Sequence, residues 1–122
     1  MISFDILRDE GIVIITPEAP LQKSDFDMLS REVDAYIRDH GDLAGLIIHT
    51  ESFPGWDDFS GFTHHIKFVK AHHRNIRRVA AVTDGKILPI IPNLARHFVT
   101  AEIRHFNFDD FDNAMAWVKE AA

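Results

Sequence analysis

A short apolar run in the middle of the chain constrains the fold more than any other stretch. Residues 43–48 read Leu-Ala-Gly-Leu-Ile-Ile, and the polar residues His49, Thr50 and Glu51 follow them directly. An apolar run of this length, bounded by turn-forming residues, is typical of a strand that is buried on both faces. The run therefore predicts a central strand in a parallel sheet.

The residues after this strand predict where a binding site lies. Pro54 and Gly55 break regular structure, and Asp57 and Asp58 stand where the amide groups of a following helix would favour carboxylates. Strand, loop and helix N-terminus together form the place where open α/β sheets bind ligands. No catalytic motif accompanies them, so the sequence predicts a location and no reaction.

The remaining elements are predicted from periodicity and from turn residues. Residues 2–7 and 11–16 are predicted to form a hairpin around the turn 8–11. Ser24 is predicted to cap a helix that ends at Gly41, and Asp109 to cap the last helix. Further elements are predicted as a helix over about 57–73, a strand over 78–84 and a strand over 101–106. The two helices with clear apolar stripes bury Phe26, Leu29, Val33, Tyr36 and Ile37 in the first, and Phe111, Ala114, Met115 and Val118 in the last.

This order of elements, ββαβαβαβα, predicts a single α/β domain with a five-stranded mixed sheet. The first strand should run antiparallel to the second, and each later strand–helix–strand passage should join parallel strands. A chain of 122 residues is long enough for one such domain and its core.

The segment over residues 86–99 has more apolar surface than one helical stripe needs, and Pro89 and Pro92 cannot both lie inside a regular helix. It is predicted to be a broken element that fills the core, covers a dimer interface or forms a lid over an apolar pocket. In the last case the pocket would be lined by Phe53, Trp56, Leu88, Ile90, Ile91 and Leu94.

The composition indicates the cellular compartment of the protein and excludes several kinds of functional site. The chain has no cysteine, which excludes disulfides, thiolate metal sites and a cysteine nucleophile. No signal peptide is apparent, and no apolar run approaches the ~20 residues that span a bilayer. We therefore expect a cytoplasmic protein. A second expectation is that the protein binds peripherally to the inner face of the membrane.

Charge is divided unevenly along the chain, whose net charge is −6. Residues 59–101 contain seven basic residues and one acidic residue, a net charge of +6, so the rest of the chain carries −12. This basic stretch predicts contact with anionic lipid headgroups, a solvated helix face or contact with the acidic part of a second copy. Nucleic acid is not expected, because no nucleic-acid-binding motif is present. The candidate anion contacts are Lys67, Lys70, Arg74, Arg77 and Arg78.

Histidines and carboxylates are candidates for a metal or catalytic site. His49 with Glu51 and Asp84 is the best carboxylate–imidazole group, but a strand-end histidine is more often a packed, hydrogen-bonded residue. The chain has no nucleophile motif and no glycine-rich phosphate loop. We expect no metal, no cofactor and no enzymatic activity.

The order of elements and four short motifs resemble the SpoIIAA-like family, relatives of the STAS domain. The motifs are Phe53-Pro-Gly-Trp56, Arg78-Val-Ala-Ala-Val-Thr-Asp84, Ala101-Glu-Ile-Arg104 before Phe106, and Ala114-Met-Ala-Trp117. The resemblance implies a STAS-like β–α superhelix that is also similar in fold to lipid-binding CRAL-TRIO domains. By this resemblance we expect a non-catalytic module that binds an apolar or amphipathic, lipid-like ligand.

The same resemblance implies an alternative function. STAS proteins that antagonise anti-sigma factors are phosphorylated on a serine at the start of the helix after the third strand, and this switches their protein partner. The corresponding region here lacks the family's Asp-Ser-Ser-Gly run, and its serines are Ser52 and Ser60. A regulatory switch through either serine is thus the alternative expectation. A homodimer is expected as a further partner, because surplus apolar surface is more often covered than bare.

Overall fold

The computed structural model describes residues 2–17, 23–51, 75–85, 88, 92 and 101–121. Two short strands open the chain, followed by a long helix, three further strands, a 3₁₀ turn and a final helix. Their bounds are β1 Ile2–Leu7, β2 Ile12–Pro17, α1 Lys23–His40, β3 Leu43–His49, β4 Ile76–Val82, β5 Glu102–Phe106, η2 Phe108–Asp110 and α4 Phe111–Lys119.

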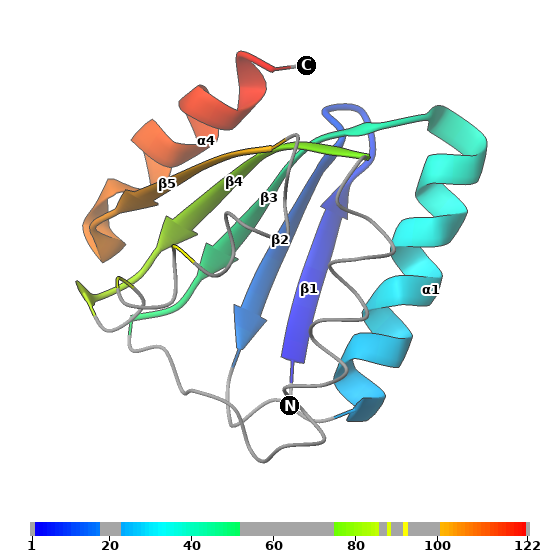
Figure 1. Cartoon of the computed structure of the whole chain (residues 1–122), viewed down its shortest axis with the longest axis horizontal. Helices are drawn as coiled ribbons and strands as arrows, with labels where there is room; N and C mark the ends of the chain where they lie inside the picture. The colour runs from blue at the N-terminus through cyan, green and yellow to red at the C-terminus, as the bar shows by residue number, and fades with distance from the viewer. Residues whose placement is uncertain are drawn as a thin grey trace.

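The five strands form one sheet whose spatial order, β1-β2-β3-β4-β5, follows the sequence. β1 pairs with β2 antiparallel, and β2, β3, β4 and β5 are parallel to one another. Figure 1 shows this order, with α1 near the β1 side of the sheet and α4 near β5. The structure therefore confirms the predicted α/β fold with its opening hairpin and its mixed sheet.

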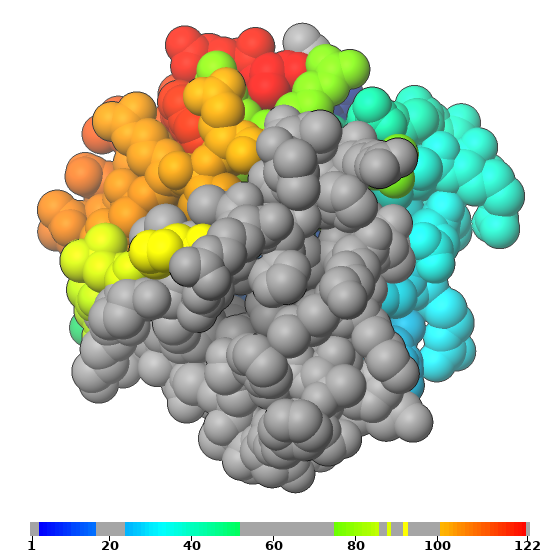
Figure 2. Space-filling view, in the orientation of Figure 1, coloured from blue at the N-terminus to red at the C-terminus, as the bar shows by residue number. Residues whose placement is uncertain are grey.

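The two helices cover different faces of the sheet, and Figure 2 shows them on different sides of the molecule. α1 packs its stripe of Phe26, Leu29 and Val33 against Val13 and Ile15 of β2. α4 packs Ala114 and Val118 against Ile12 of β2 and Ile47 of β3 in a second core. Successive side chains of a strand alternate between faces, so the neighbours Ile12 and Val13 belong to opposite cores.

Gly45 allows α4 to approach the sheet closely. A Cβ atom at this position would overlap Cγ1 of Val118 and would lie 2.8 Å from the main-chain oxygen of Arg78. Val118 itself has no exposed surface. The glycine within the apolar run is therefore required by packing between β3 and α4.

Several predicted boundaries were wrong by a few residues. β4 begins at Ile76, because this buried residue pairs with Leu43 of β3, and it ends at Val82. Ser24 lies inside α1, which begins at Lys23, so it is not the helix cap. Asp109 lies in η2, and the residue before α4 is Asp110, which makes no side-chain capping bond.

Gly41 is confirmed as the end of the first helix. Its φ angle of +91° lies in the left-handed region that favours glycine. Its amide donates a hydrogen bond to the oxygen of Ile37. The helix predicted over 57–73 and nearly all of segment 86–99 lie outside the described residues.

Candidate functional site

The carboxyl ends of three parallel strands lie side by side. His49, Val82 and Phe106 are register partners at the ends of β3, β4 and β5. Pairing continues beyond the strands, because the Thr50 amide donates to the Val82 oxygen at 3.1 Å and the Asp84 amide to the Glu51 oxygen at 3.3 Å. This edge is the position at which open α/β sheets bind ligands.

His49 is packed between aromatic rings at this edge. Its imidazole stacks on Phe108 of η2, with centroids 5.0 Å apart and planes 13° apart, and lies 4.5 Å from the ring of Phe111 in α4. Desolvation by burial lowers the pKa of His49 below its ordinary value of 6.5. The ring is consequently neutral at pH 7 and forms part of an aromatic surface.

The aromatic contacts of His49 with η2 and α4 agree with the prediction of a packed histidine at the end of a strand. Across the ranges that the structure describes, no group of three histidine, cysteine or acidic residues is placed to hold a metal ion. Phe108 and Phe111 were not expected to contact His49. An aromatic residue shortly after β5 and a histidine at the end of β3, with β4 between these strands, are the signal that would have found this contact.

Thr83, the residue after β4, is held by its main chain. Its amide donates to the Phe106 oxygen at 3.2 Å, and its oxygen lies 2.9 Å from Nε2 of His105. A carbonyl can only accept, so Nε2 of His105 carries the proton. The Thr83 side chain has no exposed surface, and its hydroxyl has no hydrogen-bond partner among the described residues. Such a buried, unpaired hydroxyl costs about 1–3 kcal/mol.

An exposed apolar side chain stands at the same edge. Leu88 is 51% exposed, and its Cδ1 atom would lie 3.6 Å from a Cβ atom built on Gly85. The other large apolar side chain that is exposed in the described ranges is Met28 of α1. The remaining predicted ligand-lining residues lie outside these ranges: Phe53, Trp56, Ile90, Ile91 and Leu94.

The family model described as SpoIIAA-like matches residues 12–119. The chain belongs to the SpoIIAA-like family. A crystal structure of an uncharacterized DUF3478-family protein from Shewanella loihica PV-4, which has a SpoIIAA-like fold, is similar to this chain with a TM-score of 0.72. The two are 17% identical, over 97% of this chain and 92% of the other, which shows a shared fold. Among curated proteins, none matches the chain.

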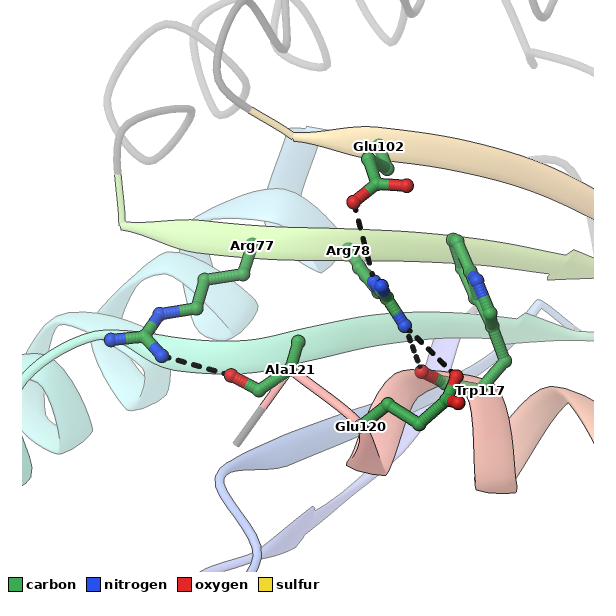
Figure 3. Close-up of polar contacts among 6 residues, drawn as sticks. All are labelled: Arg77, Arg78, Glu102, Trp117, Glu120 and Ala121. Atoms are coloured by element: carbon green, nitrogen blue, oxygen red, sulfur yellow. Dashed lines mark hydrogen bonds and ion pairs between the residues drawn. The ribbon is translucent and has the colours of Figure 1, made fainter.

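In this SpoIIAA-like domain, the predicted anion contact Arg78 is engaged within the chain (Figure 3). Its guanidinium lies 3.5 Å from Glu102 and 3.2 Å from Glu120, and Nη1 donates to the Trp117 oxygen at 2.6 Å. The guanidinium carbon also lies 4.8 Å from the centroid of the Trp117 ring. These contacts join β4 to β5 and to the C-terminal end of α4, and they balance the charge of Arg78.

The neighbouring Arg77 is exposed, and its Nη1 donates to the Ala121 oxygen at 2.8 Å. Both arginines lie at the start of β4, away from the carboxyl edge of the SpoIIAA-like sheet. The other predicted contacts lie outside the described residues: Lys67, Lys70, Arg74 and the serines Ser52 and Ser60. Among the helices that the structure describes, none is long and apolar enough to cross a membrane.

The environment of His49 predicts a pH dependence of stability. Below its ordinary pKa of 6.5 the unfolded SpoIIAA-like chain takes up a proton that the folded chain does not, because the folded pKa is lowered. The free energy of unfolding should therefore fall as the pH drops from 6.5 toward the folded pKa. His49→Phe keeps an aromatic ring and removes this contribution, so its stability should fall less. Urea unfolding of both proteins at about pH 7.5 and about pH 5.5 measures the difference, and parallel losses would contradict the prediction.

Proposed function

We propose that this SpoIIAA-like chain is a non-catalytic module that binds an apolar or amphipathic small molecule at the carboxyl edge of β3, β4 and β5. The observation that carries the proposal is the exposed Leu88 side chain beside Gly85, at a sheet edge that is suited to ligands. Covering a leucine side chain completely is worth about 1.5–3 kcal/mol, so a ligand that covers its exposed half gains affinity.

The aromatic surface formed by His49, Phe108 and Phe111 supports the same proposal. The imidazole of His49 is neutral at pH 7 and partly desolvated. An apolar ligand that covers it therefore does not have to desolvate a charge. Ligand pockets are mainly lined by apolar and aromatic side chains with few polar groups. The proposed lining also includes Phe53, Trp56, Ile90, Ile91 and Leu94, on the strength of their sequence pattern.

Membrane contact is a secondary part of the proposal. Anionic headgroups would be met by Lys67, Lys70, Arg74 and Arg77, and Arg78 is left out because two glutamates already balance its charge. The regulatory switch through Ser52 or Ser60 stays the alternative function. It is not the main proposal, because no contact among the described residues favours it.

Binding of the neutral dye Nile red tests this function. We expect saturable binding to the native chain and an affinity about 5-fold lower for Leu88→Ser, because the dye loses part of an apolar contact worth about 1 kcal/mol. Trp56→Ala should weaken binding as well. Met28→Ser is the matched control, since Met28 is 43% exposed but lies on α1, and it should leave the affinity unchanged. Lack of saturable binding, or equal losses in the Leu88 and Met28 variants, would argue against the site.

A further inference from the structure

The hydroxyl of Thr83 is a buried polar group that the folded chain leaves unused. Within the described ranges the buried polar side chains are Asp25 and Thr83, and Asp25 has an interaction partner. Oγ1 of Thr83 has none among these residues and no accessible surface. Native structures satisfy nearly all buried polar groups, so a group of this kind calls for an occupant or a role.

Thr83 cannot move away to find a partner, because both of its main-chain groups are bound to β5. The amide is held by the Phe106 oxygen, and the carbonyl by the imidazole of His105. Only the hydroxyl is left to interact, and it can donate one hydrogen bond and accept others. It is thus fixed in position beside the end of β4, at the edge where the ligand site is proposed.

The burial of this hydroxyl and the charges of the residues after β3 and β4 indicate which chemical group could bind it. Residues 50–51 and 83–85, which follow β3 and β4, include two carboxylates and no cationic side chain, and the guanidinium carbon of Arg104 in β5 lies 4.8 Å from the centroid of the Phe106 ring. Thr83 itself offers a single uncharged group at a fully buried position. Burying an ionised carboxylate against one neutral hydroxyl costs far more than a neutral hydrogen bond returns, whereas an alcohol is well matched.

We infer that Thr83 is the polar anchor of the proposed ligand site and that the ligand is an uncharged amphipathic molecule whose hydroxyl group hydrogen-bonds with Oγ1 of Thr83. This inference rests on the proposed function and narrows its ligand class to long-chain or polycyclic alcohols, excluding fatty acids. Oγ1 has no exposed surface in the ligand-free chain, so binding requires a local rearrangement and should be slower than a simple diffusional encounter.

Displacement of Nile red by decan-1-ol and by decanoate, two molecules with the same chain length, tests the inference. For the native chain we expect decan-1-ol to bind about 10-fold more tightly than decanoate. Thr83→Val keeps the shape and removes the hydroxyl, so it should weaken the binding of decan-1-ol by about 10-fold relative to that of decanoate and abolish the preference for the alcohol. Thr83→Ser keeps the hydroxyl and should retain the preference for the alcohol.

Urea unfolding of the ligand-free variants accompanies the binding assay. Thr83→Val should raise the midpoint of unfolding, because it removes an unpaired buried hydroxyl, and this also shows that the variant folds. If Thr83→Val raises stability but binds decan-1-ol as the native chain does, or if the native chain prefers decanoate, the inference is overturned while the apolar site stands. If the native chain binds neither Nile red nor decan-1-ol, the proposed function itself is overturned and the inference with it.

Discussion

Replacing Gly45 with alanine should destabilise the folded chain by about 3 kcal/mol or more, at the upper end of the range for overpacked cores. The added methyl group would overlap Cγ1 of Val118 and approach the main-chain oxygen of Arg78 to 2.8 Å. Neither neighbour can yield easily, because Val118 is fully buried and Gly45 is the register partner of Arg78 in the sheet. Urea denaturation followed by circular dichroism measures the loss.

Two further variants define the origin of that loss. Gly85→Ala adds the same methyl group where the nearest atom, Cδ1 of Leu88, lies 3.6 Å away, so it should change stability by less than about 0.5 kcal/mol. Combining Gly45→Ala with Val118→Ala should cost less than the sum of the two single changes, because the smaller residue vacates part of the space. A Gly45→Ala protein as stable as the native chain would mean that β3 and α4 are not packed this closely.

Arg78→Met should cost about 2–3 kcal/mol, the second largest effect that we expect. The arginine side chain is only 20% exposed, and it donates to the Trp117 oxygen at 2.6 Å while lying over the Trp117 ring. Glu102 and Glu120 are about two-thirds exposed, so their ion pairs contribute little by themselves. Most of the loss should therefore persist in 1 M NaCl, which screens surface ion pairs.

Arg77→Met is the matched control, because Arg77 is the adjacent residue and has the same side chain. It is exposed and donates a single bond to the Ala121 oxygen, so its replacement should cost less than about 1 kcal/mol. Arg78→Lys should recover only part of the loss, since an ammonium group cannot reach the three partners of the guanidinium fork. Equal losses for the Arg77 and Arg78 variants, or a loss abolished by salt, would show that the contacts around Trp117 do not stabilise the fold.

The fold could be predicted because its signals are local. The apolar run before His49, the glycine at position 41 and the stripe of α1 each report their own element, and family resemblance joined them into one topology. Boundaries were wrong where tertiary contacts outweigh local preference. The fourth strand was predicted to begin at Arg78, yet β4 begins at Ile76, because this buried residue pairs with Leu43 of β3.

The candidate site could be predicted less well, because its decisive features depend on pairs of residues far apart in sequence. The carboxyl edge itself follows from a parallel sheet. The stacking of His49 on Phe108 joins residues 59 positions apart, and the unpaired state of the Thr83 hydroxyl depends on which groups surround it. No local pattern encodes either. Of the predicted apolar lining residues, only Leu88 falls where the structure describes the chain, and it is exposed there.

The sequential strand order has a consequence for how the chain emerges from a ribosome. Each strand pairs only with strands next to it in sequence, so the sheet can grow as synthesis proceeds. The face that carries Ile12, Ile47, Ala80 and Val82 is covered by α4, which is translated after all five strands. A nascent or truncated chain that lacks α4 would thus expose this apolar face. Holdase chaperones should bind the exposed face until the final helix has been synthesised.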